Sequence, residues 1–261
     1  MSPSGPRRFL PFVLIVASLL LGGCVYIRLL QLRIQLGDFD KNFTVDARDG
    51  LTLTFKNPIL LDEDMEGFFK WVPDSRERSG VGEKWHFAWV KKPPVEDVVQ
   101  EPLEVGLDVF FTEHKVVTIS APERFFAVSM PKSLALGALM SLGHSKVNQE
   151  KRQVDGTIDS QVLQSAAADR FLSRSGLLAA LGRPTSVTLD KGCEEWNYDF
   201  LPVSKRQRFG DSGTVYIHFT LDSDTGKVRI MKGRTMFGGI VFDTTKVGPG
   251  ATASLNAGLP Q

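Results

Sequence analysis

The sequence contains little cysteine, little histidine and almost no net charge, and the shortages exclude whole classes of protein. Two cysteines among 261 residues are too few for a disulfide framework. The 31 basic and 30 acidic residues leave a formal net charge of +1, which excludes a strongly basic nucleic-acid-binding protein. Only one segment is apolar enough to suggest a membrane, so a protein with several membrane spans is also excluded.

Residues that form a hydrophobic core, in contrast, are plentiful. Hydrophobic residues make up 42% of the chain, and 18 of them are phenylalanine. This composition excludes a disordered chain and predicts a folded protein of one large or two small domains.

Motifs of common enzyme chemistry are missing. The sequence contains neither a Gly-x-Ser-x-Gly motif nor a phosphate-binding Gly-Lys-Ser/Thr loop. Ser129 and Lys132 have the Ser-x-x-Lys spacing of penicillin-binding enzymes, but the two partner motifs of those enzymes are absent. Glu194 and Glu195 disfavour a thiolate at the neighbouring Cys193. We therefore expect no catalytic residue, no metal site and no cofactor.

The N-terminus has the order of a secretory signal. Two arginines precede a largely apolar run of thirteen residues at 9–21, and two glycines and Cys24 follow. The run is short for a membrane span, which takes about 20 residues. Leu21-Gly22-Gly23-Cys24 resembles the bacterial lipobox, which implies that residues 1–23 are removed and that Cys24 is lipidated. The alternative is an uncleaved signal anchor reaching Ile27.

The lipobox resemblance also implies a location. Two or more acyl chains hold a protein stably on a membrane. Val25 stands where an Asp marks retention at the inner membrane in enterobacterial lipoproteins. We therefore expect a lipid-anchored protein of the cell envelope that faces the periplasm, at the outer rather than the inner membrane.

The segment that follows the cysteine, 24–43, predicts a tether helix. Its apolar residues are spaced alternately four and three apart, as on one helix face: Val25, Leu29, Leu32, Leu36, Phe39 and Phe43. An alternation from Leu30 to Leu36 leaves a strand as the alternative. We expect the stripe to pack on the chain's own domain rather than to form a dimer seam.

The most informative pattern is an internal repeat at an offset of 111 residues. Four residues recur identically at this offset: Pro73, Ser75, Glu83 and Trp85 match Pro184, Ser186, Glu194 and Trp196. Aromatic character recurs at alternate positions, with Phe87 and Trp89 matching Tyr198 and Phe200. Two dipeptides match further on, with four extra residues between them in the second copy: Phe111-Thr112 with Phe219-Thr220, and Lys115-Val116 with Lys227-Val228.

Each copy follows the same plan of a helix, an alternating strand and a hairpin. The helices are expected near 64–71 and 165–181, and Asp222 to Gly226 has the composition of a hairpin turn. The predicted fold class is α+β, with two tandem helix-plus-antiparallel-sheet repeats at 44–130 and 157–245. A connecting helix and polar linker are expected at 131–156, and a flexible tail at 246–261.

The second copy resembles the SmpA/OmlA family of outer-membrane lipoproteins. The resemblance covers about 165–235 and consists of a helix pair, a Gly-x-Pro-Thr segment, a Trp-x-Tyr strand and a Leu-Asp-x-x-Thr-Gly-Lys-Val hairpin. That family includes an accessory lipoprotein of the β-barrel assembly machine, and the tandem form is similar to the β-lactamase-inhibitor protein fold. The resemblance implies a function in outer-membrane assembly or maintenance.

One group of charges is a candidate binding surface. Five basic residues lie in or near the strands of the second copy: Lys205, Arg206, Arg208, Lys227 and Arg229. They are expected to bind lipid headgroups, lipopolysaccharide phosphates or an acidic partner protein, unless they form a solvated strand face. The function predicted from the sequence is a non-enzymatic, lipid-anchored protein-interaction module with an envelope partner. The alternatives are a protein that binds an envelope small molecule or glycan, and an enzyme.

Overall fold

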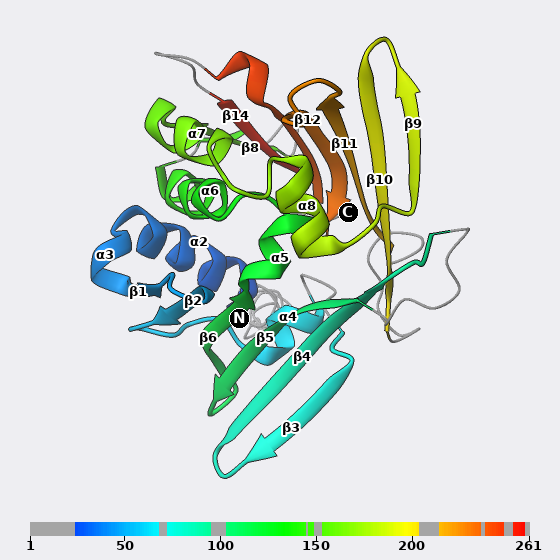
Figure 1. Ribbon diagram of the computed structural model, residues 1–261. Coiled ribbons are helices and arrows are strands. Elements are labelled where there is room, and N and C mark those ends of the chain that lie inside the picture. Colours follow the sequence, from blue (N-terminus) through cyan, green and yellow to red (C-terminus); the bar gives the residue numbers. More distant parts are fainter. Residues whose placement is uncertain are drawn as a thin grey trace, which may run out of the picture.

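Eleven strands form one antiparallel sheet that runs through both halves of the chain (Figure 1). The computed structural model describes residues 24–67, 72–94, 103–144, 146–148, 153–203, 214–235, 238–247 and 253–258. In these residues a second, three-stranded sheet and several helices accompany the large sheet. The predicted α+β class is therefore confirmed.

The first half of the chain contributes four helices and six strands to the described structure. In chain order these are α2 (Cys24–Gly37), α3 (Phe39–Asn42), β1 (Phe43–Asp46), β2 (Gly50–Phe55), α4 (Asp62–Gly67), β3 (Ser75–Ser79), β4 (Gly82–Lys91), β5 (Glu104–Thr112), β6 (Lys115–Pro122) and α5 (Glu123–Val128).

The second half contributes the remaining strands of the large sheet and further helices. Its elements are α6 (Lys132–His144), β7 (Lys146–Asn148), β8 (Gln153–Ile158), α7 (Ser160–Ala167), α8 (Arg174–Leu181), β9 (Ser186–Asp190), β10 (Cys193–Pro202), β11 (Val215–Asp222), β12 (Val228–Thr235), β13 (Gly238–Asp243), the 3-10 turn η2 (Thr244–Lys246) and β14 (Ala253–Gly258).

The strand order of the large sheet is β1-β2-β6-β5-β4-β10-β11-β12-β13. β3 pairs with β4, and β9 pairs with β10. Helix α5 packs on β2, β5 and β6 and also contacts α8, so it lies where the two halves meet (Figure 1). Helices α2, α6 and α7 form a row, in which α6 contacts both neighbours.

The alternating strands bury one face and leave the other partly exposed, as predicted. On β4, Trp85, Phe87 and Trp89 are each 1% exposed, whereas His86 between them is half-buried. The matched strand β10 buries its aromatic residues in the same way: Trp196, Tyr198 and Phe200. All six side chains belong to one continuous core. Large apolar residues occur at alternate positions of both strands because only one face of the sheet is buried.

The two halves join where β4 pairs with β10. The central pair is Val90 with Leu201, two residues that are themselves 111 positions apart. The flanking pairs are Lys91 with Phe200 and Trp89 with Pro202. At the offset of 111, Lys91 matches Pro202 and Trp89 matches Phe200, so the two flanking pairs are equivalent to each other. In a two-fold contact, every pair of residues occurs a second time with the two halves exchanged. The pairs at this junction have that property.

The hydrogen bonds around this junction follow the same rule. Lys92 N donates to Asp199 O at 2.7 Å, and the equivalent bond runs from Val203 N to Ala88 O at 3.1 Å. The two halves therefore continue each other's sheet through an approximate two-fold contact.

A side-chain contact is also repeated at this offset. The Ala88 N–H donates to Asp74 Oδ2 at 2.7 Å, and the Asp199 N–H donates to Thr185 Oγ1 at 3.2 Å. The residues of the second bond lie 111 positions after those of the first. Asp74 and Thr185 directly follow the matched prolines, so the sequence match extends to a shared hydrogen bond.

The sequence match is less accurate beyond the first strand. Trp85 lies opposite Val109, and Trp196 lies opposite Phe219. Val109, not Phe111, therefore takes the position of Phe219. The predicted match of Phe111 with Phe219 is therefore displaced by two residues. Because side chains alternate between the two faces of a strand, a displacement of two still leaves both phenylalanines on the core face.

Two elements of the second half differ from the sequence prediction. The single helix expected at 165–181 is instead two helices, α7 and α8. The Ser173 side chain accepts a hydrogen bond from Gly176 N and starts α8 as its N-cap, which interrupts the longer helix. Leu178 in α8 is 41% exposed. Gly182, with φ of 66°, ends α8 in a backbone conformation that favours glycine.

The polar linker and the flexible tail are corrected as well. The linker contains β7 and part of β8, and β14 within the expected tail pairs antiparallel with β8 over six residues. Neither segment has a strong apolar alternation. Their pairing joins residues about a hundred positions apart, which a local pattern does not reveal.

The segment 24–43 is helical over 24–37 and 39–42 and packs on its own domain, but Phe43, the last residue of the predicted helix stripe, is the first residue of β1. Leu36, Phe39 and Phe43 are buried, and Leu29 and Leu32 pack against the same core. A Cβ atom on Gly143 of α6 would lie only 2.2 Å from Gly37 N. Gly143 therefore allows α2 and α6 to cross at backbone contact. It lies within α6, one residue before the helix ends.

Candidate functional site

The candidate anchor residue, Cys24, lies in α2 and is the first residue that the structure describes. Its side chain lies outside the described structure. Because α2 packs against α6 and the core, no free linker separates Cys24 from the folded body in the described residues. The geometry at the start of α2 therefore determines how the body is held if this cysteine is lipidated.

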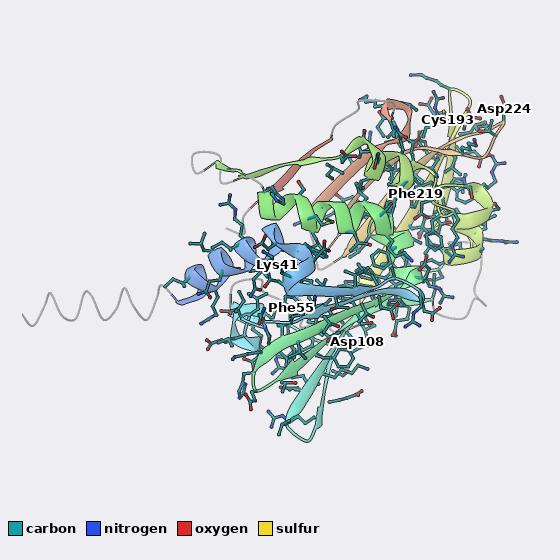
Figure 2. The ribbon with its side chains drawn as sticks, turned by 90° about the vertical axis from the view of Figure 1, so that its left-hand side faces the viewer. Lys41, Phe55, Asp108, Cys193, Phe219 and Asp224 are labelled. Atoms are coloured by element: carbon teal, nitrogen blue, oxygen red, sulfur yellow. The ribbon has the colours of Figure 1, made fainter. Side chains whose placement is uncertain are left out.

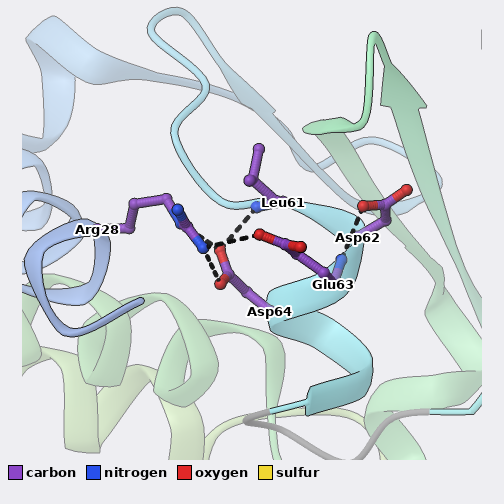
Figure 3. Close-up of polar contacts among 5 residues, drawn as sticks. All are labelled: Arg28, Leu61, Asp62, Glu63 and Asp64. Atoms are coloured by element: carbon purple, nitrogen blue, oxygen red, sulfur yellow. Dashed lines mark hydrogen bonds and ion pairs between the residues drawn. The ribbon is translucent and has the colours of Figure 1, made fainter. Parts of the chain in front are cut away.

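A buried ion pair fixes α2 near its start (Figure 3). Arg28 donates from Nε to Asp64 Oδ2 at 2.7 Å and from Nη2 to Asp64 Oδ1 at 2.5 Å. The two side chains are 14% and 2% exposed. Asp64 Oδ2 also accepts a hydrogen bond from Leu61 N at 2.9 Å, and Glu63 lies 3.3 Å from the same guanidinium. This bidentate geometry is the strong form of an Arg–carboxylate contact.

Sequence reasoning missed this ion pair. The acidic residues at 62–66 look like the charged first turn of a helix, which the helix dipole favours. Asp64 is instead buried and binds a residue 36 positions earlier. Arg28 could have indicated the pair, because it is a charged residue beside the apolar stripe of a helix. An arginine that is buried needs an acidic or polar partner.

The predicted basic surface is described only in part. Lys205, Arg206 and Arg208 lie outside the described residues. Lys227 and Arg229 are exposed at the β11–β12 hairpin, and Arg229 Nη1 lies 3.7 Å from Cys193 Sγ. This surface therefore stays a prediction.

The hairpin itself corrects one detail of that surface. Asp222 Oδ1 accepts hydrogen bonds from the Thr225 N–H and hydroxyl, which confirms the predicted turn. The pairing of β11 with β12 then shifts at a bulge between Thr220 and Leu221. Strict alternation from the buried Val228 would bury Ile230, but the bulge places Met231 in the core instead.

The outer face of the sheet carries two histidine pairs at matching places. His86 Nδ1 lies 2.6 Å from Asp108 Oδ1 across β4 and β5, and His218 Nδ1 lies 2.7 Å from Asn197 Oδ1 across β11 and β10. In the described residues, no group of three or more His, Cys, Asp and Glu side chains is placed to hold a metal ion.

The Ser129 and Lys132 spacing does not produce a described serine–lysine contact. Lys132 Nζ donates to Ala47 O at 2.8 Å and to Glu123 Oε2 at 2.9 Å. Ser129 is 2% exposed. These contacts give Lys132 a structural role between α6, the β1–β2 connection and α5.

A buried lysine connects the two halves. Lys91 at the end of β4 is 6% exposed and donates to the carbonyl oxygens of Leu181 and Arg183 at 2.7 and 2.8 Å. Burial lowers the pKa of this ammonium group because it penalises the charged form. The Tyr198 hydroxyl donates to the neighbouring Gly182 O at 2.9 Å. First-half and second-half strands thus together satisfy the C-terminal carbonyl groups of α8.

Two matched edge strands differ in chemistry. β3 exposes charged residues at its centre, and Arg76 lies 4.4 Å over the Trp85 ring. The residues of β9 that match Arg76 and Arg78 at the offset of 111 are Val187 and Leu189, which are 53% and 74% exposed. β9 pairs only with β10 among the described strands. Charged side chains protect an edge strand against pairing with another chain, and β9 lacks them at these two positions.

No described helix is long and apolar enough to cross a membrane. Searches against protein-family models, curated proteins and solved structures find no match to this chain.

Proposed function

We propose that this protein is a bacterial cell-envelope lipoprotein, anchored through Cys24 and facing the periplasm, that acts by non-enzymatic contact with other proteins. The observation that supports it best is the packing of α2. Cys24, the residue that ends the signal-like sequence, lies in a helix that Arg28 and Asp64 hold against the body. A lipid on Cys24 would therefore hold the folded body directly at the membrane.

We further propose that the body arose by duplication of one α+β unit. The exchange of pairs at the β4–β10 junction and the shared Asp74 and Thr185 contacts support it. A duplicated unit that continues one sheet through a two-fold contact presents two similar surfaces whose side chains are free to diverge.

Divergence of the edge strands supports a protein partner. Among the described strands none pairs with the outer edge of β9, which also carries two exposed apolar side chains on one face; these are the features used when an extended segment adds to a sheet. The resemblance of 165–235 to outer-membrane lipoproteins favours a partner in outer-membrane assembly or maintenance.

Changing Cys24→Ser is expected to abolish incorporation of labelled palmitate and to leave the precursor uncleaved after Gly23. The thiol is the acceptor of the first lipid, and cleavage follows its modification. The matched control is Cys193→Ser, which should keep lipid labelling and processing. A Cys24→Ser protein that is processed and fractionates with membranes like the parent contradicts the proposed anchor.

A photo-reactive amino acid at Leu189 is expected to cross-link an envelope protein in intact cells. The exposed edge of β9 brings a partner segment within reach of this side chain. The matched control places the same group at Arg78, the equivalent position on the charged strand β3. Equal cross-linking from both positions, or none from Leu189, would contradict a partner at β9.

A further inference from the structure

Helix α2 is apolar on both of its faces. One face packs on the core through Leu32 and Leu36. The other face exposes Ile27, Leu30 and Ile34, with exposed fractions of 53%, 56% and 63%. Aliphatic side chains that line up on the exposed face of a helix mark a contact surface, so this ridge of three residues points to an occupant.

The position of the ridge relative to Cys24 restricts that occupant. Residues three and seven apart share a helix face, so Ile27, Leu30 and Ile34 form one ridge. With a rise of 1.5 Å per residue, the ridge starts about 4.5 Å from Cys24 along the helix and ends about 15 Å from it. Both the cysteine and the ridge therefore belong to the same helix.

The packing of α2 prevents the ridge from turning into the body. The bidentate Arg28–Asp64 pair holds the first half of the helix, and the close approach of Gly143 to Gly37 holds its end. The core face of the helix is already occupied by Leu36. A bilayer that holds acyl chains on Cys24 is thus the surface that α2 meets.

We propose that the ridge of Ile27, Leu30 and Ile34 inserts into the interface of the bilayer that carries the acyl chains. The proposal rests on the lipid anchor at Cys24. Interfacial helices bury their apolar face about 5–10 Å deep at the boundary between headgroups and acyl chains. With α2 in that position, the lipoprotein has one fixed orientation. β9 and Cys193 then lie at the far end of the molecule from α2 and Lys41 (Figures 1 and 2).

Spin labels on the lipidated full-length protein test this orientation. The lipidated Cys24 has no free thiol, so a Cys193→Ser background accepts a single label at Leu30→Cys or, as the matched control, at Thr188→Cys on exposed β9. The protein is reconstituted into phosphatidylethanolamine–phosphatidylglycerol vesicles. Collisions of each label with oxygen, which concentrates in lipid, and with an aqueous nickel chelate are then compared.

The Leu30 label is expected to show several-fold fewer collisions with nickel and more with oxygen than the Thr188 label. If both labels are equally open to nickel while mass spectrometry shows lipid on Cys24, the membrane contact is wrong and the anchor stands. A Leu30 label shielded from both reagents indicates a protein or a second copy on the ridge and overturns the lipid contact. A protein without lipid on Cys24 overturns both proposals.

Discussion

Replacing Trp85 or Trp196 with alanine is expected to lower the free energy of unfolding by about 3–5 kcal/mol in each case. The two side chains are 1% and 5% exposed and occupy matched positions of β4 and β10. Each truncation leaves a large cavity in the shared core. If the two halves are copies of one unit, the costs should be similar, as measured by urea unfolding.

Phenylalanine variants and an exposed control separate packing from hydrogen bonding. Trp196 Nε1 donates to Glu194 Oε2 at 2.9 Å, whereas Trp85 Nε1 has no partner among the described residues. Trp196→Phe should therefore cost about 0.5–1.5 kcal/mol more than Trp85→Phe. Tyr216→Ala, at a 49% exposed position, should change stability by about 0.5 kcal/mol or less. An alanine variant as stable as the parent contradicts the matched burial.

Asp64→Ala is expected to lower the free energy of unfolding by about 3–5 kcal/mol, because it leaves the mostly buried guanidinium of Arg28 without its bidentate partner. Glu63, the second acidic contact of Arg28, is 70% exposed. Glu63→Ala is therefore the matched control and should cost about 1 kcal/mol or less.

A double variant tests whether the cost arises from the unpaired charge. Arg28→Met combined with Asp64→Leu replaces the ion pair with apolar groups and should recover most of the lost stability. An Asp64→Ala protein that unfolds at the same urea concentration as Glu63→Ala would show that the pair does not hold α2. In that case the fixed orientation proposed for the membrane-bound protein loses its support.

Local patterns were sufficient where one residue period determines both the element and its buried face. The stripe in α2, the alternation around Trp85 and Trp196 and the turn at 222–226 have the form expected from the sequence. Each depends on neighbours within about one element, so short-range sequence contains the necessary information.

Contacts between residues far apart in the sequence could not be predicted from such local patterns. The pairing of β4 with β10, the strand β14 beside β8 and the contact of Arg28 with Asp64 each join distant parts of the chain. The acidic residues at 62–66 have the same composition whether they are solvated or buried. Only the fold shows that Asp64 turns inward to Arg28, and only the strand register shows the two-fold junction.

We propose that the chain is a lipoprotein anchored at Cys24. The most direct test is the intact mass, with fragmentation of the N-terminal peptide, of protein extracted from the cell membrane. We expect a chain that lacks residues 1–23 and begins at Cys24, with a diacylglyceryl group on sulfur and an acyl group on the new amine. An unmodified cysteine, or a chain that retains residues 1–23, would contradict it.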